Sequence, residues 1–229
     1  MAATFIIEIT LALHTIWRYK LNDVTRVAVV MLGCLAIFQI AEFNVCESAW
    51  LLDSASWARL GYVAITLLPP LGIHLINRIS RDKRRWPFVT AYLLSGTFIA
   101  YFLLATGGIS TGACLGNYVI FEQGHNTSYL YGLYYYGLLL AAIVYALFRA
   151  SGSEKHIKAS LRALIVGYAL FMVPTTFVNL INPNSIAGIP SIMCGFAVLL
   201  SIVLADRVLP YYHNQKPLSA TITTFFARK

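Results

Sequence analysis

The sequence predicts an all-α polytopic membrane protein, a bundle of seven transmembrane helices with the N-terminus outside and the C-terminus in the cytoplasm. The chain of 229 residues is 59% hydrophobic and only 11% charged, whereas soluble domains are about 25% charged. Apolar segments recur that approach the ~20 residues needed to cross roughly 30 Å of hydrocarbon. This composition excludes a soluble enzyme, a disordered chain and a disulfide-rich secreted module.

The predicted spans are separated by mostly short connections. In chain order they are Ala2–Trp17, Val27–Val45, Ala58–Asn77, Phe88–Gly107, Tyr129–Phe148, Ala163–Ile181 and Pro190–Leu209. Their interiors lack the period-2 alternation of a transmembrane barrel, so helices are the expected way to satisfy the backbone in lipid. We expect residues 1–209 to form the transmembrane domain and residues 210–229 a short cytoplasmic tail.

Charge placement predicts the orientation. Of the 17 Lys and Arg residues, 16 lie in connections on one side, and only Arg59 lies on the other. By the positive-inside rule the basic side is cytoplasmic. The net charge of +8 is therefore a topology signal and implies no nucleic-acid partner. Anionic lipid headgroups are an expected partner of the stretch 81–85.

Ionisable groups inside membrane spans are costly, so each is a functional candidate. Gln39 and Glu42 lie three residues apart near the outer end of the second span and can face the bundle interior together. They indicate either a ligand-binding or proton-sensitive site that opens outward, or a structural pairing of Glu42 with Arg59 or with tyrosine hydroxyls. Glu8, in the first span, is expected to make an interhelical hydrogen bond.

An aromatic run over 129–136 begins the fifth span. Most of these rings are expected in an interfacial belt, with Tyr134 and Tyr135 as candidates to line an outward-opening cavity. Together with Gln39, Glu42 and Tyr62 they form the candidate ligand-binding set.

Cysteines and histidines leave two further alternatives open. Cys46 and Cys114 belong to outer connections, where they form either a disulfide or two unrelated free thiols. His14 and His74 lie at similar depth in their spans, where they either ligate haem b axially or bond to neighbouring helices. No His/Cys cluster has metal-site spacing, so no metal is expected.

Motifs in the second and third spans resemble a known family. Ala41-Glu42-Phe43 is followed by Trp57, by Tyr62 and by the pair Pro69-Pro70. This pattern resembles the seven-helix N-terminal sensor region of bacterial histidine kinases. Gly167, Pro174, Asn179 and the segment 205–210 are similar to later parts of that region. The absence of lysine in 192–209 excludes a retinal-binding microbial rhodopsin.

The resemblance implies a sensing role in the bacterial inner membrane. In that family a linker and a kinase core follow the seventh helix, and the 20-residue tail here is too short to hold them. We therefore expect a non-enzymatic sensor or accessory subunit that binds a small amphipathic ligand or a partner membrane protein and signals to a separate effector. The alternatives are a structural scaffold subunit of a larger membrane complex and a haem-binding membrane protein.

Overall fold

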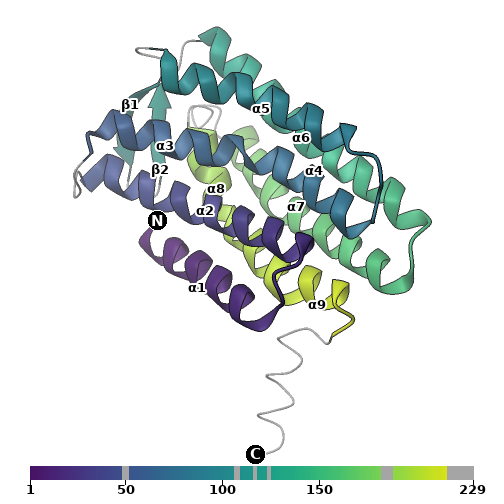
Figure 1. The fold of residues 1–229 in the computed structure, drawn as a ribbon. Helices are drawn as coiled ribbons and strands as arrows, with labels where there is room; N and C mark the ends of the chain where they lie inside the picture. Colours follow the sequence, from purple (N-terminus) through teal and green to yellow (C-terminus); the bar gives the residue numbers. More distant parts are fainter. Residues whose placement is uncertain (48–51, 106–108, 116–117, 123–124, 182–187, 216–229) are drawn as a thin grey trace, which may run out of the picture.

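The computed structural model describes residues 1–47, 52–105, 109–115, 118–122, 125–181 and 188–215. Its helices run side by side in one bundle, with two short strands beside one end (Figure 1). The elements are α1 (Ala2–Arg18), α2 (Asp23–Glu47), α3 (Ser54–Thr66), α4 (Leu68–Ile79), α5 (Trp86–Leu104), β1 (Ser110–Leu115), β2 (Tyr118–Glu122), α6 (His125–Ser151), α7 (Lys155–Ile181), α8 (Ile189–Val203), the π-helical turn η2 (Leu204–Val208) and α9 (Leu209–Tyr212).

These elements correspond to the seven predicted spans. Within the described residues, six helical stretches are long and apolar enough to cross a membrane, with α3–α4 and α8–η2–α9 each counted as one stretch. The seventh span is α1, which has 17 residues. The predicted all-α bundle is confirmed, although the predicted boundaries shift by several residues at most ends.

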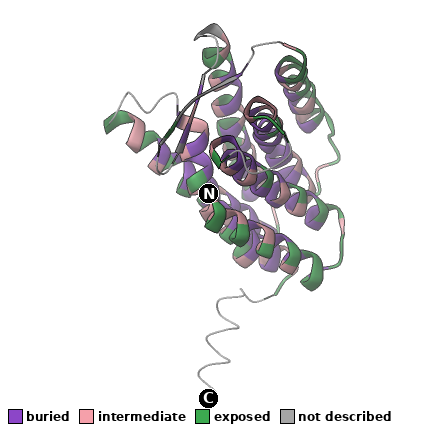
Figure 2. Ribbon diagram, turned by 90° about the vertical axis from the view of Figure 1, so that its left-hand side faces the viewer, coloured by how far each residue is buried: buried purple, intermediate pink, exposed green. Residues whose placement is uncertain are grey.

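The interior of the bundle lies around α2 and the α3–α4 span. Helix α2 contacts α1, α3, α4 and α8, and 15 of its 25 residues are buried. Figure 2 colours the buried residues of the bundle purple. Helices α5, α6 and α7 instead expose large apolar side chains on their outer faces, including Leu93, Leu140 and Val173. This arrangement suits an outer layer in contact with lipid, where apolar side chains need no polar cover.

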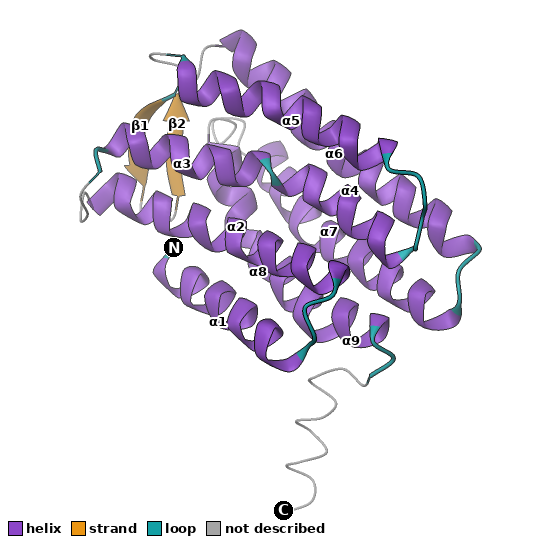
Figure 3. Ribbon diagram, in the orientation of Figure 1, coloured by secondary structure: helices purple, strands orange, loops and turns teal. Residues whose placement is uncertain are grey.

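The connection 108–128 differs from the expected loop, because part of it forms an antiparallel hairpin of β1 and β2 (Figure 3). Val119 and Phe121 of β2 are buried, while Ile120 between them is half-buried. This alternation is typical of a strand with one buried face. The strand was not predicted because only helices were expected from the sequence.

A proline pair divides the third span. Pro70 has no N–H, so the carbonyl four residues earlier, at Thr66, receives no backbone donor from it. Helix α3 accordingly ends at Thr66 and α4 begins at Leu68. Helix α7, by contrast, continues through Pro174.

Candidate functional site

A buried polar cluster joins α1, α2 and α8 near the strand end of the bundle. The Gln39 side chain accepts a hydrogen bond from the Thr4 hydroxyl at 2.7 Å, and its amide donates to the Cys194 carbonyl at 3.1 Å. One amide of α2 thus links the two neighbouring helices. We call Thr4, Glu8, Gln39, Glu42, Ser191 and Ser201 the α1–α2–α8 cluster.

The cluster contains two buried carboxyl groups, Glu8 at 0% and Glu42 at 2% exposure. The Ser191 hydroxyl of α8 is a neighbour of Glu42, and the Ser201 hydroxyl of α8 is a neighbour of Glu8. Among the described residues neither carboxyl group forms an ion pair, so the expected pairing of Glu42 with Arg59 is not seen. The interhelical hydrogen bond expected of Glu8 is not formed, since neither of its carboxyl oxygens has a partner among the described residues.

The five candidate ligand-binding residues have different surroundings among the described residues. All five side chains are buried, and only Gln39 and Glu42 belong to the cluster. Tyr62 packs edge-on against Phe102 and Phe121, with ring centroids 5.1 Å and 5.2 Å away. Its ring is therefore part of an aromatic core.

Tyr134 and Tyr135 have separate surroundings, because adjacent helix positions face different neighbours. The Tyr134 hydroxyl donates to the Thr66 carbonyl at 2.7 Å. Tyr135 lines a mainly apolar internal cavity that also touches Tyr168 and Cys194 and holds no more than about one water molecule. Cys194 is the point where this cavity meets the cluster.

The two candidate haem ligands lie on α1 and α4, which both contact α2. The His74 ring in α4 lies 3.2 Å from the Tyr92 hydroxyl through Nδ1 and accepts a hydrogen bond from Arg78 Nε at 3.1 Å through Nε2. Both nitrogens are thereby engaged with protein. His14 belongs to α1, and its Nε2 is buried without a partner among the described residues. Haem binding stays an expectation, with the absorption spectrum as its test.

Cys46 and Cys114 are joined as a disulfide, with Cα atoms 5.9 Å apart. The bond ties the end of α2 to β1. It anchors the hairpin whose Val119 N–H donates to Ser191 Oγ of α8 at 3.1 Å. Cys34 and Cys194 are buried free thiols.

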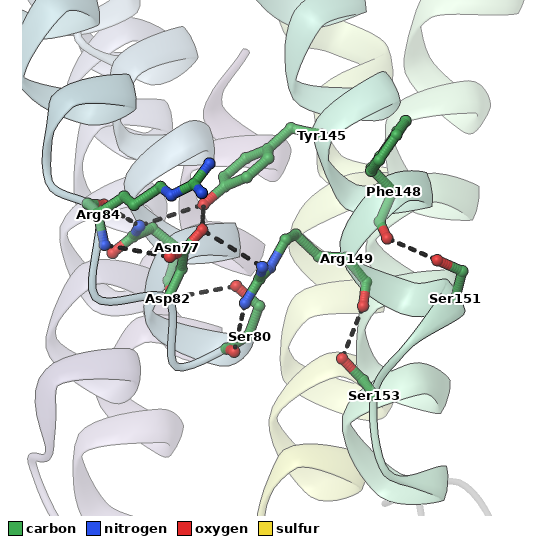
Figure 4. Close-up of polar contacts among 9 residues, drawn as sticks. All are labelled: Asn77, Ser80, Asp82, Arg84, Tyr145, Phe148, Arg149, Ser151 and Ser153. Carbon is green, nitrogen blue, oxygen red and sulfur yellow. Dashed lines mark hydrogen bonds and ion pairs between the residues drawn. The ribbon is translucent and has the colours of Figure 1, made fainter.

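A second polar group lies at the opposite end of the bundle and was not identified from the sequence. The Tyr145 hydroxyl of α6 donates to Asp82 Oδ2 at 3.1 Å, and Arg149 of α6 lies 3.5 Å from the same oxygen. Asn77 of α4 donates to the Arg84 carbonyl at 2.7 Å and to the Tyr145 hydroxyl at 3.2 Å. We call Asn77, Asp82, Tyr145 and Arg149 the α4–α6 network (Figure 4).

The network favours an ionised Asp82. The Arg84 backbone N–H, the Tyr145 hydroxyl and the Arg149 guanidinium together hold the pKa of this carboxyl below its ordinary value. Arg149 also donates to the Ser80 carbonyl at 3.3 Å, so it connects α6 to the chain on both sides of Arg81, which has a positive φ of 52°. One feature of the sequence could have indicated this network: Asp82 is an acidic residue in a connection whose other charged residues are basic.

The fold and these two polar groups define a polytopic helical membrane protein with polar centres near both ends of its bundle. The family model described as the N-terminal 7TM region of histidine kinase matches residues 1–209, and the chain belongs to this family. The expected resemblance is therefore confirmed. In histidine kinases this region is the non-catalytic membrane sensor. A comparison with curated proteins finds no significant match.

Proposed function

We propose that the chain is a non-enzymatic membrane sensor that receives its signal at the α1–α2–α8 cluster and passes it to a separate effector at the α4–α6 network. The input is a small amphipathic ligand or a partner membrane protein. Such an input shifts the bundle only if it binds one conformation better than another. The family membership supports the sensing role, and the two buried polar groups supply candidate input and output points.

The observation that carries the proposal is the divided α3–α4 span. Helix α3 packs against α2 and β1, whereas α4 ends beside Asn77 of the network. The two halves meet at Thr66, whose carbonyl accepts hydrogen bonds from Tyr134 of α6 and from Ser95 of α5 at 3.1 Å. Side-chain hydroxyls replace part of the backbone hydrogen bonding at this break. The angle between α3 and α4 can therefore change slightly, whereas uninterrupted backbone hydrogen bonds would resist such a change.

The proposal places the cluster on the outer side and the network on the cytoplasmic side, as the positive-inside rule predicts. Single cysteines replacing Leu52 and Lys83, both exposed, test this orientation in intact cells with a membrane-impermeant maleimide. The Leu52→Cys variant should react before permeabilisation and Lys83→Cys only after it. The reverse labelling order would contradict the orientation.

The effector is tested by purification from native membranes in mild detergent, followed by mass spectrometry. We expect a kinase-like signalling protein to co-purify with the wild-type chain and to be depleted with the Asp82→Asn variant. The variant Leu140→Ala, on the exposed face of α6, is the matched control and should retain the partner. Absence of a signalling protein, together with no stabilisation by any small amphipathic molecule, would contradict the proposal.

A further inference from the structure

We infer that Glu8 is a proton-binding site: it lies in the bundle as a neutral carboxylic acid beside the Ser201 hydroxyl of α8. The inference comes from counting the donors available to the cluster. It goes beyond the proposed function and does not rest on it, because proton occupancy is a property of the folded bundle.

The count begins with Glu8 itself. Its side chain is fully buried at 0% exposure, and neither of its oxygens has a hydrogen-bond partner among the described residues. A neighbouring hydroxyl is that of Ser201, which donates to the Ala197 carbonyl of its own helix at 3.2 Å. A hydroxyl has one proton to give and two lone pairs to accept with. Ser201 can therefore accept from Glu8 while it donates to Ala197.

None of the other donors in the cluster bonds to Glu8. The Gln39 amide accepts from Thr4 through Oε1 and donates one N–H of Nε2 to the Cys194 carbonyl, and neither Glu8 oxygen has a hydrogen bond from the remaining N–H. An ionised Glu8 would thus be buried without a donor unless Ser201 gave up its bond to Ala197, which is unfavourable for a charged group. A protonated Glu8 brings its own donor and meets the acceptor that Ser201 presents.

Glu42 is the matched contrast within the same cluster. Ser191 Oγ accepts the backbone N–H of Val119 at 3.1 Å, so its own proton is free for the neighbouring Glu42 carboxyl group. Glu42 therefore has a donor in either protonation state, whereas Glu8 gains one only if Ser201 gives up its bond to Ala197. The donor count assigns a proton to Glu8 and requires none on Glu42.

The charged and titratable groups around Glu8 do not supply a counter-ion. Glu42 of α2 and the Cys194 thiol of α8 are acidic groups that interact with it, and the Met1 amino group is a more weakly interacting positive charge. In η2, Asp206 and Arg207 lie 3.0 Å apart as an ion pair. The described residues also contain no group of three or more metal-ligating side chains, so a proton rather than a metal ion fits this position.

Ionisation of Glu8 would remove the proton that its carboxylic acid can donate to Ser201. Because α1 contacts α8 and η2 as well as α2, loss of this bond would loosen the first helix from the last one. Proton release at Glu8 is thereby coupled to the contact between α1 and α8.

Infrared spectroscopy of the full-length protein in detergent at neutral pH tests the inference through the carbonyl stretch of a protonated carboxylic acid. The wild-type spectrum should contain this band, Glu8→Gln should lack it, and Glu42→Gln should retain it. The amide in Glu8→Gln can still donate to Ser201, so the variant should fold, which its melting temperature checks.

Three results would overturn the inference: no acid band in the wild type, a band that persists in Glu8→Gln, or a band removed by adding sodium or calcium chloride at constant pH. The last result would identify a cation as the ligand. None of these three results bears on the sensor function, which the labelling and co-purification experiments test. Failure of the inference about Glu8 is therefore distinguishable from failure of the proposed function.

Discussion

The Tyr134 hydroxyl fills the place of a missing backbone donor by hydrogen-bonding the Thr66 carbonyl at 2.7 Å. The donor is missing because Pro70, four residues after Thr66, has no N–H. Ser95 adds a second hydroxyl donor to the same carbonyl at 3.1 Å. One backbone oxygen of α3 thus connects three spans, and the proline pair is accommodated by specific partners on α5 and α6.

Removing the Tyr134 hydroxyl should weaken this joint. We expect Tyr134→Phe to reduce the free energy of unfolding by about 1 kcal/mol, the typical net value of a hydrogen bond. The double variant with Ser95→Ala should cost more than the sum of the single variants, because Thr66 then loses both side-chain donors. Chemical denaturation in detergent measures both effects.

The control for this series is the adjacent Tyr135→Phe, since the Tyr135 hydroxyl makes no hydrogen bond with the described residues. If Tyr135→Phe reduced the free energy of unfolding as much as Tyr134→Phe does, the bond to Thr66 would not explain the destabilisation. Loss of a tyrosine hydroxyl would then be sufficient to explain it.

Gly72 of α4 is required by Tyr168 of α7. A Cβ built at Gly72 would overlap the Tyr168 hydroxyl, which is buried without a hydrogen-bond partner among the described residues. We expect Gly72→Ala to lower the stability by about 1–3 kcal/mol through overpacking. Adding Tyr168→Phe, which removes the overlapping oxygen, should restore part of the loss in thermal unfolding experiments.

Gly96→Ala is the matched control, because a Cβ there meets nothing within 4 Å. It should leave the melting temperature unchanged or slightly raised, since alanine is the better helix former. Equal destabilisation by both alanines, without rescue by Tyr168→Phe, would contradict the packing explanation.

The α4–α6 network should make stability depend on acid. Because hydrogen bonds and Arg149 lower the pKa of Asp82 below its ordinary value of 3.8, the folded state favours the carboxylate. The resulting stabilisation is fully present above that value and is lost as the pH falls through the lowered pKa. Asp82→Asn should cost about 1 kcal/mol at neutral pH, given a partly exposed Arg149.

The measurement is the melting temperature between pH 6 and pH 2.5, followed for both proteins. The difference between wild type and Asp82→Asn should shrink toward the acid end of this range. A difference that stays constant with pH would mean that the Asp82 charge does not stabilise the network.

The disulfide between Cys46 and Cys114 should stabilise the junction of α2 and the hairpin. The two cysteines are 68 residues apart, and closing a loop of this length in the unfolded chain is worth at most about 4 kcal/mol. Reduction, or Cys46→Ser, should lower the melting temperature, while Cys34→Ser, which alters a buried free thiol, should not mimic the effect of reduction. Non-reducing mass spectrometry should show one peptide pair joined by this bond, and two free thiols there would contradict it.

The sequence was sufficient for the bundle because long apolar segments and one-sided charge are properties of local composition. It also identified Gln39 and Glu42 as one face, since their spacing fixes their direction on a helix. The sequence could not predict the hydrogen bonds of Tyr134 with Thr66 and of Tyr145 with Asp82. The partners lie more than sixty positions apart and meet only through helix packing. The hairpin was missed because its alternation extends over only a few residues.

Electron–electron distance measurements between spin labels at Lys83→Cys and Ser151→Cys test most directly whether the cluster is coupled to the network. Both positions are exposed at the network end, one in the connection after α4 and the other at the end of α6. Gln39→Ala, which breaks the links of α2 to Thr4 and Cys194 at the far end, should shift or broaden the distance distribution, whereas Leu140→Ala should not. Identical distributions in the wild type and Gln39→Ala would contradict the coupling.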